Sequence, residues 1–471
     1  MQEAVLFRSV AELGRMIRSR EISPVELTAA YIDQANRLDP QLLAVVTLTE
    51  ELAVQQARAA EADIMSGRYR GPLHGIPWGV KDLFATDGIP TQWGSPAFDG
   101  QTFDYDATVV RKLHDAGAVL IAKLATGELA YGAKWFRGTT RCPWDTSRSS
   151  SGSSAGPGAA TAAGLVGFSI GTETDGSLIS PASVNGIVGL RPTYGRVSRY
   201  GVMVAGWTMD KPGPMGRYVD DCATVLRHVM GPDPLDPTAV DAPFEFPPQA
   251  GIRGKKIGVL RDEFDMPEDP ELRQILNAPL EVLESLGLVL EETELKDLPY
   301  REVSRLVAIE EASYFEPLIE SPRVNELLRK DHINRWAAAR MVPATDYIKM
   351  QRIRVEMMQY ASELFDRYAA LVTPAWMGTA WEADASETSG VIYRTRRRDP
   401  EDPDSALHPR ISLFSNLVGV PSVSVPCGFT EGGLPMAIQF VGAAFDESGI
   451  LQLARAYEQA TTWHERHPAL V

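Results

Sequence analysis

The chain has 471 residues, and its 44% hydrophobic and 23% charged content is typical of a globular protein that buries a sizeable core. Its formal net charge of −16 disfavours nucleic acids and acidic membrane surfaces as partners, because both are negatively charged. The three cysteines are widely separated, and their odd number disfavours a disulfide framework.

Targeting signals are not evident in the sequence. The N-terminal residues lack the basic region and the apolar core of a signal peptide. No apolar run approaches the roughly 18 residues that a membrane-spanning helix needs. We therefore expect a cytoplasmic protein that does not associate with membranes.

Residues 1–70 are predicted to form a helical segment that packs on the rest of the chain. Apolar residues recur at helical spacing from Ser9 to Arg20. Ser23-Pro24-Val25-Glu26 has the pattern of a capping box with proline at the first helical position, and this helix is expected to run to about Leu38. A third helix is predicted from Glu50 to about Met65.

Residues 71–471 are predicted to form one α/β domain. Between Gly71 and about Gly231, short apolar runs alternate with helix-length segments, which is typical of βαβ units around a parallel sheet. The apolar runs are Val119–Ala122, Val166–Ile170 and Ile187–Leu190, and the helical segments are Asp106–Ala116, Pro157–Ala163 and Asp220–Met230. We expect a large, mostly parallel mixed twisted sheet with helices on both faces.

The second half of the chain is predicted to return to this sheet after a helical insertion. Candidate strands cover Lys256–Leu260, Ser422–Pro426 and Met436–Val441, and candidate helices cover Glu271–Leu286 and Glu447–Thr462. The insertion spans residues 300–405 approximately. It includes an irregular loop with a basic cluster, Arg394, Arg396, Arg397 and Arg398.

The segment Ser147-Arg-Ser-Ser-Ser-Gly-Ser-Ser-Ala-Gly156 holds six serines and two glycines in ten positions. A flexible linker would have this composition. However, the apolar, alanine-rich run Ala159–Leu165 follows at once and predicts a buried helix. Since a flexible linker is unusual in the middle of a sheet domain, we favour a structured loop that carries hydroxyl groups.

The segment Gly171-Thr-Glu-Thr-Asp-Gly-Ser-Leu-Ile-Ser-Pro181 follows a candidate strand. A strand that ends in Thr-Asp-Gly-Ser presents backbone N–H groups at the carboxyl edge of a sheet, where α/β enzymes bind their ligands. N–H groups aimed at a developing oxyanion are what acyl transfer requires. An ordinary turn between strand and helix has the same pattern, so both interpretations stay open.

Lys81 lies in a largely apolar run, Gly75-Ile-Pro-Trp-Gly-Val-Lys-Asp-Leu-Phe84. Burial disfavours the charged form of lysine and lowers its pKa from about 10.4, and a neutral lysine can act as a general base. The alternatives are an ion pair with Asp82 and a side chain that extends to the surface.

Together these three segments resemble the landmarks of the amidase signature family: a Gly-Val-Lys-Asp stretch, a Gly-Ser-Ser-Gly-Gly stretch and a Gly-Thr-(acid)-Thr-Gly-Gly-Ser stretch. Four further segments are similar to that family, namely Val188–Gly201, Gly213–Arg217, Gly419–Pro426 and Gly433–Gly442. The resemblance implies the amidase signature fold, with the helical insertion over the active site. It also implies hydrolysis of carboxylic amide bonds, with neither a metal nor an organic cofactor.

Matched by position, the resemblance assigns Lys81 as the base, Ser153 as the serine that follows a cis peptide bond, and Ser177 as the nucleophile. The two serines are 24 positions apart, the interval that the family keeps. Lys81 would deprotonate Ser153, which takes the proton of Ser177 and later relays it to the leaving amine. The oxyanion hole falls on the backbone of Thr174, Asp175, Gly176 and Ser177, and water then hydrolyses the acyl-enzyme.

Three positions depart from the commonest family pattern. Asp175 replaces the first glycine of Gly-Gly-Ser, and its carboxylate would oppose an oxyanion unless the side chain turns away. Ile179 stands where many members carry an arginine that pairs with the acid at position 173, here Glu173, so that ion pair is missing or replaced. Ala155 replaces the first glycine after the paired serines.

Three other interpretations stay open. Gly152-Ser153-Ser154-Ala155-Gly156 also matches the nucleophile elbow of an α/β-hydrolase-type esterase, but no strand is predicted directly before it. The chain could instead be the glutaminase-type A subunit of a glutamyl-tRNA amidotransferase complex, which shares the fold and triad and releases ammonia for a partner. A non-catalytic binding protein is disfavoured, because all three chemical positions are intact.

The substrate class is predicted from aromatic residues near the motifs. Five residues are expected to contact the substrate: Tyr131, Trp135, Phe136, Ser154 and Trp207. Trp336, Trp376 and Trp381 of the insertion are further candidates. Apolar walls suit a neutral aryl or alkyl amide, and esters and carbamates (urethanes) pass through the same tetrahedral oxyanion. We expect a small-molecule substrate and a monomer or homodimer.

Overall fold

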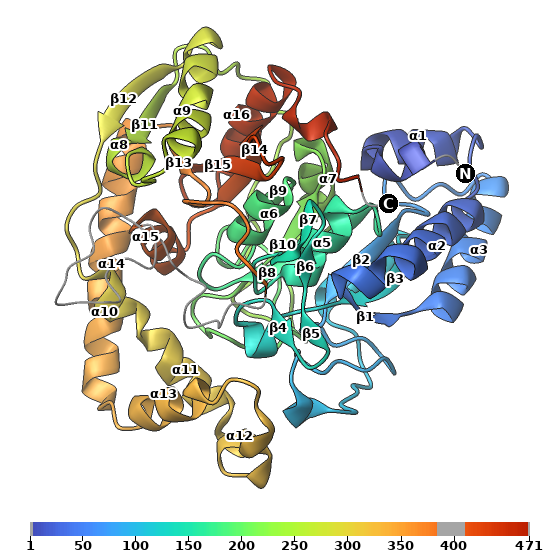
Figure 1. Ribbon diagram of the computed structural model, residues 1–471, viewed down its shortest axis with the longest axis horizontal. Helices are drawn as coiled ribbons and strands as arrows, with labels where there is room; N and C mark the ends of the chain where they lie inside the picture. The colour runs from blue at the N-terminus through green and yellow to red at the C-terminus, as the bar shows by residue number, and fades with distance from the viewer. Residues whose placement is uncertain (1–2, 384–409, 470–471) are drawn as a thin grey trace.

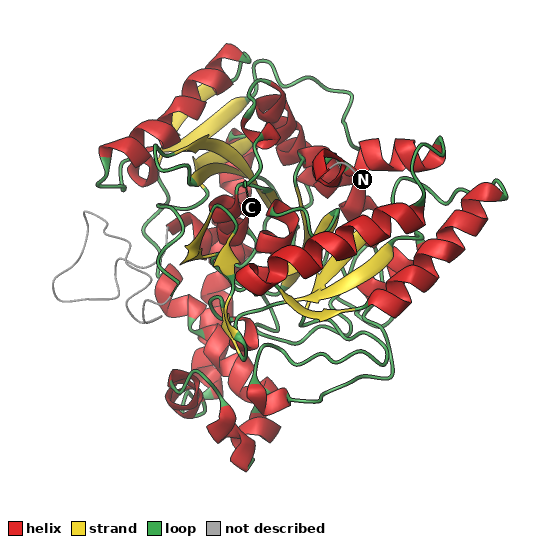
Figure 2. Cartoon of the chain, turned by 45° about the vertical axis from the view of Figure 1, so that its right-hand side comes forward, coloured by secondary structure: helices red, strands yellow, loops and turns green. Residues whose placement is uncertain are grey.

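The computed structural model describes residues 3–383 and 410–469. Within these residues an 11-stranded mixed sheet runs through the molecule, with helices on both of its faces (Figures 1 and 2). The strand order is β1-β3-β2-β8-β10-β9-β14-β15-β13-β11-β12. In this order the strands cover Val45–Leu48, Val119–Leu124, Pro77–Lys81, Phe168–Glu173, Lys211–Gly216, Val188–Arg191, Ser422–Phe429, Pro435–Val441, Ala370–Pro374, Lys256–Leu260 and Val289–Thr293.

The predicted mixed α/β architecture is confirmed, and the sheet is more antiparallel than the sequence suggested. Within the described residues, four of its ten neighbouring strand pairs are parallel and six are antiparallel. β10 accounts for part of this difference, because it runs antiparallel between β8 and β9. Its sequence, Lys-Pro-Gly-Pro-Met-Gly, is rich in residues that are depleted in strands, so its pattern does not predict a strand.

Most predicted elements are present, with small shifts at their ends. β11 has the predicted bounds, and the runs near 119, 166, 187, 422 and 436 correspond to β3, β8, β9, β14 and β15. The helices that match predicted segments are α4 (Thr108–Asp115), α5 (Ala155–Ala162), α7 (Val219–Val229), α9 (Pro270–Ser285) and α16 (Glu447–Gln459). Three α-helices were not predicted, α6 (Ile179–Asn185), α8 (Arg261–Phe264) and α15 (Arg410–Val418).

Residues 3–70 contribute a 3₁₀ helix (Glu3–Phe7), three α-helices and one strand to the described structure. α1 (Val10–Arg18) and α2 (Pro24–Leu42) each begin with a complete capping box. α3 (Glu50–Met65) packs on α2. The short strand β1 was not predicted, and it pairs antiparallel with β3 at the edge of the sheet. This segment therefore shares the sheet of the rest of the chain.

A group of helices follows β12 and lies at the lower left of Figure 1. It comprises α10 (Tyr300–Ser304), α11 (Leu306–Tyr314), α12 (Glu316–Ile319), α13 (Asp331–Ala339) and α14 (Ala344–Arg367). α15 (Arg410–Val418) packs against α10 and α14, and the three helices share an apolar cluster. Residues 384–405 of the predicted insertion, with Arg394, Arg396, Arg397 and Arg398, lie outside the described residues.

The main apolar core lies between the sheet and its covering helices. Trp78 of β2 and Phe168 of β8 stack there, with ring centroids 5.9 Å apart. All three cysteines are buried and free. Among the helices described, none combines the length and the hydrophobicity that crossing a lipid bilayer requires.

Candidate active site

Lys81 ends β2, and its side chain is fully buried. β2 and β8 are parallel neighbours, so their carboxyl ends lie at the same edge of the sheet and bring Lys81 beside Thr172. The Nζ atom of Lys81 lies 2.7 Å from Ser153 Oγ, 3.1 Å from Ser154 Oγ and 2.9 Å from Thr172 Oγ1. The lysine is therefore surrounded by three hydroxyl groups.

The charge state of Lys81 follows from this environment. Burial lowers the pKa of Lys81 to about 7, although Asp210 and Glu173 raise it through their negative charge. The neighbouring Asp82 does not form an ion pair with Lys81, because its carboxylate lies 3.4 Å from the Nζ atom of Lys123. Near neutral pH, a large fraction of Lys81 is therefore the uncharged amine, which can accept a proton.

The hydrogen bonds of Ser154 fix the direction of its contact with the lysine. Ser154 Oγ donates to the carbonyl oxygen of Thr172 (3.1 Å) and accepts from the N–H of Thr172 (3.2 Å). Because the one hydroxyl proton is already used, Ser154 must accept from the Lys81 amine. A neutral amine can then donate its second proton to Thr172 Oγ1 and keep its lone pair for the hydroxyl proton of Ser153.

Ser153 follows a cis peptide bond from Gly152, as the resemblance implied. The loop around this bond is tied to the next motif: the N–H of Ser154 donates to the carbonyl oxygen of Ser177 (3.2 Å). Ser180 Oγ also donates to the carbonyl oxygen of Gly152 (3.3 Å). These hydrogen bonds hold the two serine-containing segments side by side.

Ser177 lies in the turn between β8 and α6. Gly176 has a φ of 85°, in the left-handed region that favours glycine. Within the described residues, the N–H groups of Asp175, Gly176 and Ser177 donate to no acceptor. They are therefore available to bind an oxygen atom of a ligand, which is the arrangement that an oxyanion hole requires.

Glu173 supports this turn from inside the protein. Its Oε2 accepts from the N–H groups of Leu178 (2.8 Å) and Ile179 (3.0 Å), and its Oε1 accepts from Arg191 (2.8 Å) and Asn416 (2.9 Å). Burial raises the pKa of Glu173, but the charge of Arg191 outweighs it and the pKa falls to about 2. The arginine that is absent at position 179 is thus replaced by Arg191 at the end of β9.

The side chain of Asp175, which replaces a glycine of the family pattern, also has a hydrogen-bond partner. Its Oδ1 accepts from the hydroxyl of Ser412 in α15 at 2.8 Å. Thr174 Oγ1, one residue earlier, donates to Asp210 Oδ1 at 2.5 Å. Both side chains next to the candidate oxyanion hole are therefore held by hydrogen bonds.

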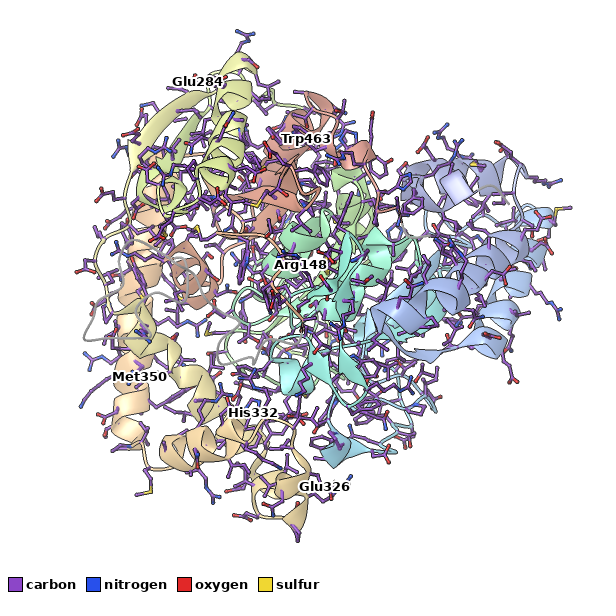
Figure 3. All side chains as sticks on the ribbon, viewed as in Figure 1. Arg148, Glu284, Glu326, His332, Met350 and Trp463 are labelled. Carbon is purple, nitrogen blue, oxygen red and sulfur yellow. The ribbon has the colours of Figure 1, made fainter. Side chains whose placement is uncertain are left out.

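Ser153, Ser177, Thr174 and Asp175 open on a cavity of about 1170 Å³. One wall comes from α11, α13, α14 and the link between the last two, and it is largely apolar: Val307, Ala308, Ile309, Ala338, Ala339, Val342 and Met350. Figure 3 labels Met350 at the lower left, within this helical group. The lining also includes the hairpin of β4 (Lys134–Trp135) and β5 (Gly138–Thr139). The cavity is therefore enclosed by segments that are far apart in the sequence.

The predicted aromatic contacts divide into two groups. Tyr131, Trp376 and Trp381 line the cavity, and the two tryptophan rings stack with centroids 6.1 Å apart. Trp135 and Phe136 instead pack in a small apolar cluster behind the hairpin. The indole N–H of Trp135 donates to the carbonyl oxygen of Leu43 (3.2 Å), and neither Trp135 nor Phe136 is part of the cavity lining.

The other predicted contacts lie elsewhere. Ser154 is buried and contacts Lys81, so it supports the lysine and is not part of the cavity lining. Trp207 is 58% exposed and lines a second cavity of about 460 Å³, together with Thr172 and Asp210. Trp336 is buried in the core, where its indole N–H donates to Glu311 (3.1 Å).

Four supporting residues were not identified from the sequence: Thr172, Arg191, Asp210 and Ser412. Thr172 and Arg191 lie inside the family-like motifs, so their neighbourhood was visible but their partners were not. Asp210 directly precedes β10, and Ser412 lies in α15. The sequence around Asp210 and Ser412 does not predict their place in the site, because the pairing of β10 in the sheet and the packing of α15 determine it.

The nucleophile elbow of an α/β-hydrolase requires a strand of the central sheet directly before the serine. Here β7 (Asp145–Ser149) precedes Ser154, and it pairs with β6 (Arg141–Cys142) in a separate two-stranded sheet. The geometry therefore gives no support to Ser154 as a nucleophile of that type. Within residues 3–383 and 410–469, no group of three or more His, Cys, Asp or Glu side chains could hold a metal ion.

Comparison with known proteins agrees with this geometry. The sequence model of the Amidase family matches residues 26–451. The chain is 35% identical to the A subunit of the glutamyl-tRNA(Gln) amidotransferase of Moorella thermoacetica, over 98% of each chain.

Two solved structures are also similar over 98% of this chain and 98% of the other. The peptide amidase from Stenotrophomonas maltophilia is 31% identical, with a TM-score of 0.83. A bacterial aryl acylamidase of the amidase signature enzymes family is 26% identical, with a TM-score of 0.86. The fold and the site thus define an enzyme that hydrolyses amide C–N bonds. The chain belongs to the Amidase family, the amidase signature enzymes.

Proposed function

We propose that this enzyme cleaves linear carboxylic amides through an acyl-enzyme on Ser177, with Ser153 and Lys81 as the proton-transfer pair. The neutral amine of Lys81 accepts the proton of Ser153, and Ser153 takes the proton of Ser177 as the latter attacks the carbonyl carbon. The C–N bond then breaks as Ser153 returns a proton to the leaving amine. Water attacks the acyl-enzyme by the same proton path and releases the acid.

The observation that carries this proposal is the environment of Lys81. Its pKa of about 7 and its 2.7 Å contact with Ser153 Oγ suit a base that works near neutral pH. The open N–H groups of residues 175–177 support stabilisation of the tetrahedral oxyanion.

The substrate is proposed to carry an apolar aryl or alkyl group on one side of the amide. The apolar wall from α11, α13 and α14, with Trp376 and Trp381, supports such a group, because burying apolar area contributes about 25 cal/mol per Å². Esters and carbamates are proposed as further substrates, since they form the same oxyanion.

The test is a comparison of kcat/KM for an anilide, an aryl ester and an aryl carbamate of the same acyl group, with glutamine as the small polar amide. Acid quenching followed by peptide mass spectrometry identifies the acylated residue. We expect the acyl group on the peptide that contains Ser177. An acyl group on Ser153 or Ser154 would contradict the proposal, and so would glutamine as the best substrate by more than about tenfold, roughly 1.4 kcal/mol of barrier.

A second candidate function is favoured by one observation, the 35% identity to the A subunit of an amidotransferase over 98% of each chain. In that case Ser177 would release ammonia from glutamine for a partner enzyme. The discriminating measurement is glutaminase activity with and without the other members of such a complex. A large increase on their addition would favour this function over the free-standing amidase.

A further inference from the structure

The cavity at Ser177 is lined by a group of basic residues that amide hydrolysis does not use. Within the described residues, the lining includes six basic side chains: Lys134, Arg137, Arg141, Arg305, Arg329 and Arg335. The lining includes one acidic residue, Asp175. The chain as a whole has a net charge of −16, so this local excess of positive charge does not reflect the average composition.

Two of these arginines already have acidic partners. Arg335 forms an ion pair with Glu311, and its guanidinium lies over the ring of Tyr131, 4.3 Å from the centroid. Arg329 lies 3.0 Å from Asp331. The charges of these two arginines are therefore compensated within the protein, and their side chains are held in place as part of the wall.

Three other basic residues have no such partner. Lys134, Arg137 and Arg305 are exposed, and none of their side chains forms a hydrogen bond or an ion pair with another described residue. Arg137 is held over the rings of Trp135 (5.5 Å) and Phe136 (5.7 Å), which positions the guanidinium. Burial raises the pKa of Asp39 and the charge of Arg137 opposes this shift, but the two side chains form no ion pair.

The three residues come from two separate segments. Lys134 and Arg137 lie on and next to the β4–β5 hairpin, which is below the main sheet in Figure 1. Arg305 lies at the junction of α10 and α11, two positions before Val307, which lines the cavity together with Ala308 and Ile309. An apolar group and an anion could therefore bind next to each other along this wall.

We propose that the substrate carries a carboxylate at the end remote from the scissile amide, and that Arg137 and Arg305 bind it. This inference rests on the proposed function of the same cavity, and it replaces the expectation of a neutral substrate. A guanidinium binds a carboxylate through paired hydrogen bonds, which gives orientation as well as affinity. The bound carboxylate fixes the distance between the anionic end and the amide that reaches Ser177.

The same chemistry could come from a carboxylated aryl or alkyl amide or from an amino-acid amide such as glutamine. An amino acid also brings an ammonium group, which needs an acidic partner when it is desolvated. Asp175 is the one acid in the described lining, and Ser412 already donates to it (2.8 Å). The lining therefore favours an anionic amide without a free ammonium group.

Two matched substrate pairs test the charge alone. Succinanilic acid and its 4-oxopentanoyl analogue differ by a carboxylate and a methyl ketone on the acyl side. 4-Carboxyacetanilide and 4-acetylacetanilide make the same comparison on the amine side. We expect kcat/KM of the wild-type enzyme to be at least about tenfold higher for the anionic member of one pair, with a preference that weakens as salt is added.

Substitutions of Arg137 and Arg305 test whether these residues cause the preference for the anionic substrate. In Arg137→Gln/Arg305→Gln the ratio of anionic to neutral kcat/KM should fall below about twofold. Arg58→Gln is the matched control, because Arg58 is an exposed arginine of α3 without a described ion pair, outside the cavity. This control should keep the wild-type ratio.

Binding to the Ser177→Ala protein, measured by calorimetry, makes the inference independent of turnover. The carboxylated amide should bind more tightly than its neutral partner, and the arginine double substitution should remove this difference. If the wild-type enzyme cleaves the neutral anilide through Ser177 but shows no preference in rate or binding, this inference alone is overturned. A preference that persists in the double variant, or glutamine as the best substrate, would also overturn it. Arginine-dependent binding without any Ser177-dependent cleavage would instead refute the proposed function.

Discussion

Two parts of the cavity at Ser177 differ in whether their charged side chains have partners within the protein. The floor is the buried part around Lys81 and the turn at Ser177, and the outer wall is the part that carries Arg137 and Arg305. On the floor, Lys81, Glu173 and Asp175 each have defined hydrogen-bond partners within the protein. On the outer wall, the side chains of Arg137 and Arg305 form no ion pair and no hydrogen bond with another described residue. The difference indicates that the polar groups of the floor are preorganised for one reaction, whereas the charged groups of the outer wall are available to pair with a ligand.

The two regions also differ in where they come from in the chain. The floor is built from β2, the loop before α5 and the turn after β8, all within residues 81–178. The wall combines the β4–β5 hairpin, which lies between these floor segments in the sequence, with α10, α11, α13 and α14, which lie more than 100 residues later. Mutations in the floor should therefore change kcat for every substrate, whereas mutations in the wall should change the preference among substrates.

The largest effect is expected for Ser177→Ala. This change removes the proposed nucleophile and leaves the supporting hydrogen bonds of Glu173 in place. We expect kcat to fall by at least about 10³-fold for all substrates, because the three residues act as one unit. Steady-state kinetics and circular dichroism of the purified variant check this, and near-normal turnover would refute the assignment.

The next largest effect is expected for Lys81→Met, which fills a similar volume without a basic group. We expect a loss of about 10²- to 10⁴-fold in kcat/KM, typical of a general base.

The pH dependence of kcat/KM tests the role of Lys81 more specifically than the size of the loss. Because burial lowers the pKa of Lys81 to about 7 and the protonated amine cannot accept a proton, the wild-type kcat/KM should rise about tenfold per pH unit below 7. It should level off above that value, where the amine is neutral. The Lys81→Met variant should lose this rise, and an unchanged profile would mean that another group is the base.

A smaller effect is expected for Arg191→Met, which leaves the buried carboxylate of Glu173 without its ion-pair partner. Breaking a buried pair on one side costs about 3–5 kcal/mol, so thermal unfolding should shift strongly and kcat should fall as the turn at Ser177 loosens. Ile179 lines the same small cavity as Glu173 and Arg191. Adding Ile179→Arg to Arg191→Met should therefore restore stability and activity in part.

Ile179→Leu in the same background is the control for that rescue, since it changes shape without adding charge. Equal behaviour of the arginine and leucine variants would show that the charge at Glu173 does not need a nearby arginine.

The outcome of the sequence-based predictions depends on how clear the local sequence pattern is. Elements with clear hydrophobic periodicity, such as β11 and α9, were predicted within one or two residues of their ends. β10 and β12 were not, because one is rich in proline and glycine and the other is half-exposed at the sheet edge.

The candidate site shows the same limit. Lys81, Ser153 and Ser177 follow from motifs that are continuous in the sequence. The substitution of Arg191 for an arginine at position 179 could not be predicted, because it depends on the pairing of β9 with β10 and β14. The burial of Trp135 outside the cavity lining likewise involves a distant partner, the carbonyl oxygen of Leu43, 92 positions earlier.

The smallest effect is expected for Ser412→Ala, which removes the hydrogen-bond partner of the Asp175 carboxylate on the floor. This carboxylate lies next to the N–H groups that are proposed to bind the oxyanion, and Ser412 holds it by one hydrogen bond of 2.8 Å. Ser412→Ala should free the carboxylate to oppose the developing negative charge. Since one hydrogen bond to a charged group contributes about 1.5–3 kcal/mol, the fall in kcat should not exceed about 10- to 150-fold, with little change in KM. In an Asp175→Asn background the carboxylate charge is gone, so the same Ser412→Ala change should cost less than about twofold. A double-mutant cycle on kcat measures this coupling directly. Additive effects of the two substitutions would mean that Asp175 does not act through its charge.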